Sequence, residues 1–142
     1  MRKKVFIVLN IIIPLFVGSV LYYLMSPDTI FVEIFDQIIR REVHKPTLSL
    51  ENGIFCFLRF YFLDMCWAYA LTFSLYAILG NNTAAFNWRI FLLALFFSAS
   101  MECLQLVSFV KGTFDVVDIL SEVLAEGVAV FIIKYAHEEA VL

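Results

Sequence analysis

The fold of this chain is decided by residues 88–136, in which two long apolar segments flank one short polar turn. The segments are WRIFLLALFFSASMECLQLVSFV (88–110) and VVDILSEVLAEGVAVFIIKYA (116–136), and the turn is KGTFD (111–115). Each segment reaches the roughly 20 residues that a helix needs to cross a bilayer. Lipid-facing β-strands would be only about 10 residues long and would alternate strictly. The stretch therefore predicts two antiparallel transmembrane helices.

The whole chain has the composition of a membrane protein. Hydrophobic residues make up 63% of its 142 residues, charged residues make up 16%, and the mean hydropathy is +0.91. A soluble domain of this size buries only about two-thirds of the surface of its unfolded chain, which is too little for so much apolar surface. This excludes a soluble enzyme, a disulfide-stapled secreted domain and a disordered chain. The net charge of −3 also predicts no nucleic-acid partner.

Two further apolar segments, residues 5–25 and 54–79, extend the predicted bundle. The basic residues Arg2, Lys3 and Lys4 precede the first segment and favour a cytoplasmic N-terminus. We read the first segment as a retained helix, because its apolar core is longer than that of a signal peptide. The prediction is one all-α, polytopic domain over residues 1–142 in a bacterial inner (cytoplasmic) membrane, with both termini cytoplasmic. Its four transmembrane helices span residues 5–25, 54–79, 88–110 and 116–136.

The connection between the first two spans, residues 26–53, carries a helical pattern of its own. Its apolar residues recur with the period of one helix face. This stripe is too short to cross a bilayer, so it predicts a short amphipathic helix in the outer interface. Such a helix is either a lid or lipid-contacting platform, or a packing connector between spans, and base rates favour the connector. The stripe consists of Ile30, Phe31, Ile34, Phe35, Ile38 and Ile39.

Ionisable residues inside the predicted spans are the strongest functional signal, because a charge at the bilayer centre costs at least roughly 2.5–3.5 kcal/mol. Asp118, Glu122 and Glu126 are spaced by four and share one helix face. Glu102, about 12 Å from the outer end of its span, lies at a similar depth. These groups therefore converge in the outer half of the bundle. The predicted polar cluster comprises Arg59, Asp64, Glu102, Gln105, Asp115, Asp118, Glu122 and Glu126.

The charges of this cluster do not balance, since one arginine accompanies five buried carboxyl groups. On one straight helix Arg59 and Asp64 lie about 140° apart, so we expect Arg59 to pair with Glu102 or Glu122. The remaining carboxyl groups must take up protons or bind a cation. An alternative is that Arg59 and one or two acids form a clamp between helices. Carboxylates alone are a weak metal signature, and we predict neither a metal nor a cofactor.

Part of this pattern resembles the VanZ-like family of small integral membrane proteins. Their core pattern is E-x-x-Q near the end of one span and D-x-x-D at the start of the next, matched here by Glu102 with Gln105 and by Asp115 with Asp118. The resemblance covers about residues 54–130. Glu122 departs from it, because many relatives carry asparagine near that position. The named member of the family is associated with resistance to the glycopeptide antibiotic teicoplanin, so the resemblance implies a role in the bacterial cell envelope linked to such resistance.

Three functions remain open at this stage. The leading interpretation is a protein that binds an amphiphile, a lipid head group or a cation in the polar cluster, with membrane lipids or lipid-linked envelope molecules as partners. The second is a membrane enzyme acting on a lipid-linked envelope precursor, with carboxylates as metal ligands or acid–base groups. The third is a structural subunit, either in a homo-oligomer or with another membrane protein. Because the chain lacks the usual catalytic motifs, we expect a binding protein rather than an enzyme.

Overall fold

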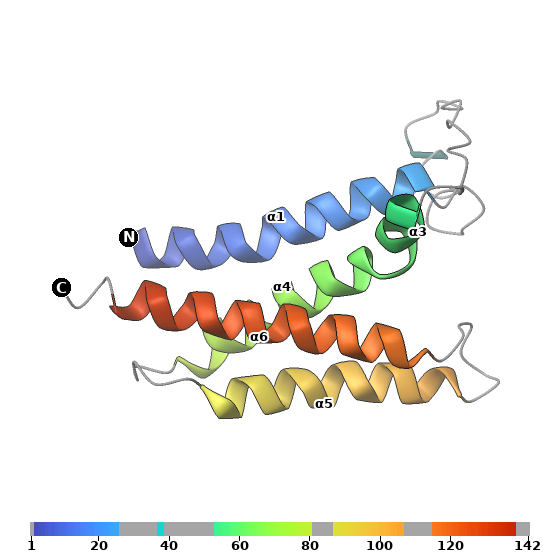
Figure 1. The fold of residues 1–142 in the computed structure, drawn as a ribbon. Coiled ribbons are helices and arrows are strands. Elements are labelled where there is room, and N and C mark those ends of the chain that lie inside the picture. The colour runs from blue at the N-terminus through green and yellow to red at the C-terminus, as the bar shows by residue number, and fades with distance from the viewer. Residues whose placement is uncertain (1, 26–36, 39–52, 81–86, 107–114, 139–142) are drawn as a thin grey trace.

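The computed structural model describes residues 2–25, 37–38, 53–80, 87–106 and 115–138. All regular secondary structure in these ranges is helical, which confirms the all-α prediction. Figure 1 shows the elements side by side along one direction, with the start of the first helix and the end of the last at the same end of the molecule. The helices are α1 (Arg2–Met25), α3 (Gly53–Phe60), α4 (Phe62–Leu79), α5 (Trp88–Gln105) and α6 (Val116–Glu138).

Three of these helices are long and apolar enough to cross a membrane. The candidate spans are Lys4–Leu24 in α1, Phe62–Leu79 in α4 and Trp88–Gln105 in α5. They support a small multi-pass membrane protein. The 23-residue helix α6 is longer than α4 or α5. Helix α6 differs from the three candidate spans in carrying the acidic residues Asp118, Glu122 and Glu126.

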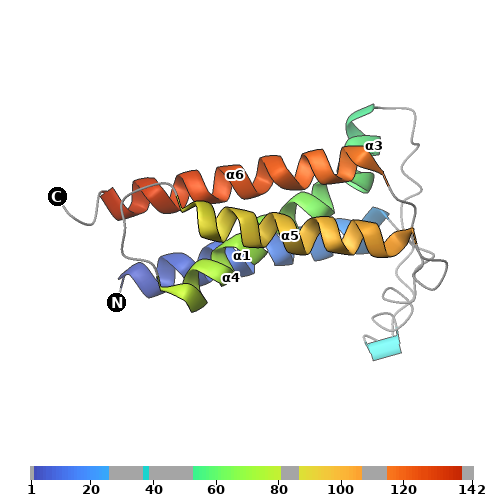
Figure 2. The ribbon, with the colours of Figure 1, turned by 90° about the horizontal axis from the view of Figure 1, so that it is seen from below.

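Helix α4 is the centre of the bundle, because it contacts α1, α5 and α6. In Figure 1, α1 lies at the top, α5 at the bottom and α6 between them, and in the view of Figure 2 α6 lies along the upper edge. Helix α1 approaches α4 closely at Gly18, where an added Cβ would lie 3.1 Å from Leu63 Cδ1 and 3.2 Å from Cys66 Cβ. Small residues allow this close backbone approach in membrane proteins. The Tyr69 hydroxyl also donates a hydrogen bond to Asn10 Oδ1 over 2.6 Å.

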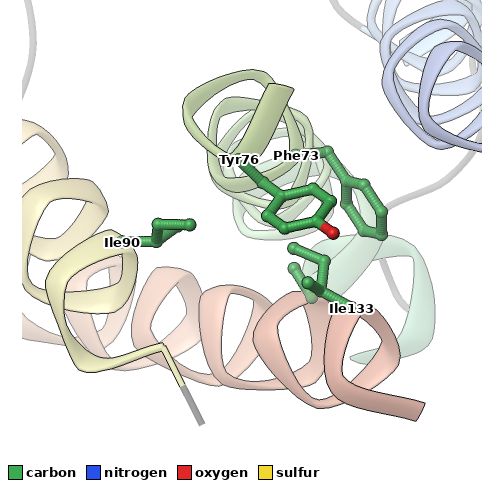
Figure 3. Close-up of a cluster of buried hydrophobic side chains, with 5 residues drawn as sticks. Phe73, Tyr76, Ile90 and Ile133 are labelled. Carbon is green, nitrogen blue, oxygen red and sulfur yellow. The ribbon is translucent and has the colours of Figure 1, made fainter. Parts of the chain in front are cut away.

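An apolar cluster packs α4, α5 and α6 together in the half of the bundle nearest the termini. Its side chains come from all three helices and meet between them (Figure 3). Lipid is as apolar as these side chains, so van der Waals packing rather than exclusion of water holds them together. The apolar cluster consists of Phe73, Tyr76, Ile90, Ala129 and Ile133.

The prediction of one helix over residues 54–79 is wrong, because the segment forms two helices that meet at Tyr61 (Figure 1). Tyr61 has φ −115° and ψ −32°, well away from the usual helical φ near −63°. Its ring packs on Phe57, with the centroids 5.7 Å apart, and its hydroxyl bonds to Asp115 at the start of α6. This tertiary contact accompanies the bend. Residues 54–79 contain no proline or glycine that would have indicated it. The angle of about 140° between Arg59 and Asp64 assumed one straight helix, so it does not apply across the break at Tyr61.

The predicted span 88–110 also ends earlier than expected. Helix α5 ends at Gln105, with Leu106 as its cap, and residues 107–110 lie outside the described residues. Glu102 is therefore about 4.5 Å from the end of its helix along the axis, not about 12 Å. The predicted interfacial helix lies outside the described residues except at Gln37 and Ile38, which are helical and exposed.

Candidate functional site

An acidic cluster lies in the half of the bundle opposite the termini, between α4, α5 and α6. Asp64 is in the first turn of α4, Glu102 is in the last turn of α5, and the other members are on α6. The Asp64 carboxyl interacts electrostatically with Asp118 and Glu102. Glu122 interacts with the other four members. The acidic cluster is defined here as Asp64, Glu102, Asp118, Glu122 and Glu126.

The carboxyl groups on α6 become more buried along the helix. Asp118 is half-buried, Glu122 is 4% exposed and Glu126 is 0% exposed. From α5, Glu102 is 4% exposed. The cluster therefore opens toward the start of α6 and closes toward the middle of the bundle.

Two hydrogen bonds hold the deepest acids in place. Ser98 Oγ donates to Glu126 Oε1 over 2.7 Å, linking α5 to α6. Gln105 Nε2 donates to Glu102 Oε1 over 2.9 Å, within α5. Both donors lie on one face of α5, since Ser98, Glu102 and Gln105 are spaced by four and three residues.

The second oxygen of each buried glutamate has no such partner in the described part of the chain. Among the described residues, none donates a hydrogen bond to Oε2 of Glu102, Glu122 or Glu126. Buried polar atoms in proteins are nearly always paired, and an unpaired buried charge is more costly still. Within the part of the chain that the structure describes, the acidic cluster thus contains three buried acceptor oxygens that receive no hydrogen bond.

Asp115, at the rim, has a structural role. Its Oδ1 accepts a hydrogen bond from the Val117 N–H over 2.9 Å, which is the pattern of a helix N-cap. Its side chain also accepts the bond from Tyr61, and Asp115 interacts electrostatically with Glu102 of α5. The predicted site residue Asp115 thus starts α6 and interacts with both α4 and α5.

The backbone of Arg59 belongs to α3 rather than to α4. Its side chain lies outside the described residues, so pairing of Arg59 with Glu102 or Glu122 stays a prediction. In the part of the chain that the structure describes, no three His, Cys, Asp or Glu side chains are arranged to hold a metal ion. Among the described residues, Cys56, Cys66 and Cys103 form no disulfide.

A separate cavity of about 340 Å³ lies between α1, α4 and α6. Its walls are almost entirely apolar, with Pro14 of α1, Cys66 of α4 and Ala125 of α6 among them. The sequence patterns indicated neither this cavity nor the Asn10–Tyr69 bond across α1 and α4. A polar Asn10 within an otherwise apolar span was the available signal for the bond. Tyr61 carried no signal, since tyrosine is common in spans.

The fold and the acidic cluster together define the class, a small helical membrane protein with acidic residues buried among its helices. Comparison of the chain with protein-family models, curated proteins and solved structures gives no match in any of the three.

Proposed function

We propose that α6 is the fourth membrane-spanning helix and that the acidic cluster binds a cation inside the membrane. At 1.5 Å per residue, 23 residues reach about 35 Å, which exceeds the roughly 30 Å hydrocarbon core. The buried acids of α6 face α4 and α5, while its exposed stripe is apolar and suits lipid. That stripe consists of Val117, Leu120, Leu124, Val128, Phe131 and Tyr135.

Four crossings agree with the position of the helix ends, since α1 begins and α6 ends at the same end of the molecule (Figure 1). With Arg2, Lys3 and Lys4 on the cytoplasmic side, both termini are cytoplasmic. The acidic cluster then lies in the outer half of the membrane. Its half-buried member Asp118 is nearest the outer surface, so the cation enters from that side.

One observation carries the binding proposal, namely the three buried Oε2 atoms without a partner among the described residues. A cation supplies what each of them lacks. An ammonium group suits the cluster better than a chelated metal ion, because it offers three N–H donors to separate acceptors, whereas no metal-binding group of three is formed by the described residues. The ammonium head group of a membrane amphiphile is the source that best fits a site within the bilayer.

Thermal unfolding in a non-ionic detergent tests this proposal. Hexylammonium serves as the probe cation, hexanol as its neutral counterpart and Ca²⁺ as the metal. A ligand at one hundred times its Kd stabilises the folded state by about 2.7 kcal/mol, so Tm should rise by several degrees with hexylammonium and not with hexanol.

The matched variants are Glu122→Gln and Ser100→Ala. Among the described residues, the Ser100 hydroxyl bonds within α5, to the carbonyl oxygen of Phe96. Ser100→Ala should therefore keep the full hexylammonium shift, and Glu122→Gln should lose it. A shift with Ca²⁺ that needs Glu122 would support a metal cation as the ligand instead. If neither cation raises Tm, or if hexylammonium raises the Tm of both variants equally, the acidic cluster is not a cation site.

A further inference from the structure

The three acids of α6 form a carboxyl ladder that leads from the end of the helix into the bundle. Asp118, Glu122 and Glu126 follow one another at about 6 Å of axial rise, and each is more buried than the one before. Glu122 interacts electrostatically with both of its neighbours. The other acids that face the ladder are Asp64 from α4 and Glu102 from α5.

The ladder ends at Glu126. In the next turns of α6, the buried side chains are Ala129, Val130 and Ile133, of which Ala129 and Ile133 belong to the apolar cluster. Glu126 is therefore reached from the Asp118 end and is closed from the end that carries the termini.

Glu126 has the surroundings of a group that holds a proton rather than a charge. It is 0% exposed, it accepts one hydrogen bond from Ser98, and its Oε2 has no partner among the described residues. Burying an ionised carboxylate with so few partners is far more costly than burying the neutral acid. Lys134, two turns further along α6, is separated from Glu126 by the apolar residues named above.

We propose that Glu126 is a reversible proton-binding site, supplied from the Asp118 end through the carboxyl ladder. A proton that enters at Asp118 passes by Glu122 to Glu126 and leaves by the same route. The consequence for ligand binding rests on the proposed function. A cation that binds in the acidic cluster favours the ionised form of its acids and therefore releases protons from the ladder. In that exchange a protonated carboxyl becomes a carboxylate paired with the cation, and its proton passes to the water beyond Asp118.

Labelling with dicyclohexylcarbodiimide tests the proton site directly, because this apolar reagent enters membranes and reacts with protonated carboxyl groups. The carboxyl proton moves to one reagent nitrogen, and the carboxyl oxygen adds to the central carbon. An oxygen-to-nitrogen shift then leaves a stable acylurea, with no leaving group. The added mass is located by mass spectrometry of peptides from the full-length protein in detergent.

We expect the label on Glu126 in the wild type and in Ser100→Ala, with a labelled fraction that falls several-fold as the pH is raised. Glu126→Gln should lose this label. The wild-type result does not depend on whether a variant folds. Absence of label on Glu126 at every pH, or equal labelling of Asp118 and Glu126, would overturn the assignment of Glu126 as the proton site.

Proton release separates the exchange from cation binding itself. Hexylammonium is added to the protein in weakly buffered detergent with a pH indicator, and binding is followed in parallel by calorimetry. We expect about one proton released per cation bound, and less in Glu126→Gln. Binding without release would refute the exchange and leave the proposed function intact, whereas the absence of binding would refute the proposed function and leave the labelling result as the test of Glu126.

Discussion

The acidic cluster and the apolar cluster occupy opposite halves of the same three helices. Near the termini, Phe73, Ile90 and Ala129 are fully buried, and van der Waals contacts are all that their side chains need. In the other half, Glu122 and Glu126 are as deeply buried, yet each keeps an oxygen without a partner among the described residues. On α6 the change takes place within one helical turn, between Glu126 and Ala129.

Under the proposed function, the apolar half of the bundle provides stability and the acidic half provides the binding site. Close packing of apolar side chains stabilises a fold without specifying a ligand. Buried acids without partners destabilise it until a proton or cation arrives. The two halves should therefore respond in opposite ways to substitution.

The largest effect is expected in the apolar cluster. Phe73→Ala removes a fully buried ring from the contact of α4 with α6 and leaves a cavity. Such a substitution typically costs about 3–5 kcal/mol. Reversible unfolding in mixed detergent micelles should show this loss, while hexylammonium should still raise Tm. A loss below about 1 kcal/mol would show that the apolar cluster does not hold the bundle together.

The opposite sign is expected in the acidic cluster. Glu126→Met replaces the buried acid by an apolar side chain of similar volume, and we expect a neutral or stabilising effect, as is often found when buried ion pairs are replaced in this way, by about 1–4 kcal/mol. The same unfolding measurement applies, with Ser100→Ala as the control. Clear destabilisation by Glu126→Met would mean that Glu126 is a structural partner, and the contrast between the halves would fail.

A third substitution tests whether α1 depends on close approach to α4. Gly18→Leu introduces atoms where even a Cβ meets Leu63 and Cys66 at 3.1 and 3.2 Å, and overpacking of this kind costs about 1–3 kcal/mol. Gly127→Ala on α6 is the control, because no described side chain lies within 4 Å of its added Cβ. We expect Gly127→Ala to be neutral or stabilising by up to about 1 kcal/mol. Equal effects would show that α1 packs loosely.

The smallest effect concerns the hydrogen bond between Tyr69 and Asn10. Tyr69→Phe removes the donor of this 2.6 Å contact, and interhelical bonds in membranes average about 0.6 kcal/mol. Tyr135→Phe, at an exposed position of α6, is the matched control. Unfolding of the two variants under one condition should differ by this small amount, and a difference of several kcal/mol would make Asn10 a principal anchor of α1.

The helices and the shared face of the acids could be predicted from the sequence, because long apolar runs and a spacing of four depend only on helix geometry. Asp118, Glu122 and Glu126 follow that rule. The bend at Tyr61 could not be predicted, since it accompanies a contact with Asp115, far along the chain. The end of α5 at Gln105 could not be predicted either, because the apolar run in the sequence continues to Val110. The sequence required the acids to be buried but could not show which of them are the most buried. The apolar cavity beside α1 could not be predicted at all. Both features depend on how side chains from different helices meet.

We expect the half of the bundle opposite the termini to hold a cation among the acids whose Oε2 atoms have no partner among the described residues. Calorimetric titration of hexylammonium into the full-length protein tests it most directly. The comparison is with a triple variant that carries Glu102→Gln, Glu122→Gln and Glu126→Gln, whose folding is checked by its helical circular dichroism and its Tm. We expect one saturable site per wild-type chain and none in the folded triple variant. Equal binding by the two proteins, or no saturable binding by the wild type, would contradict it.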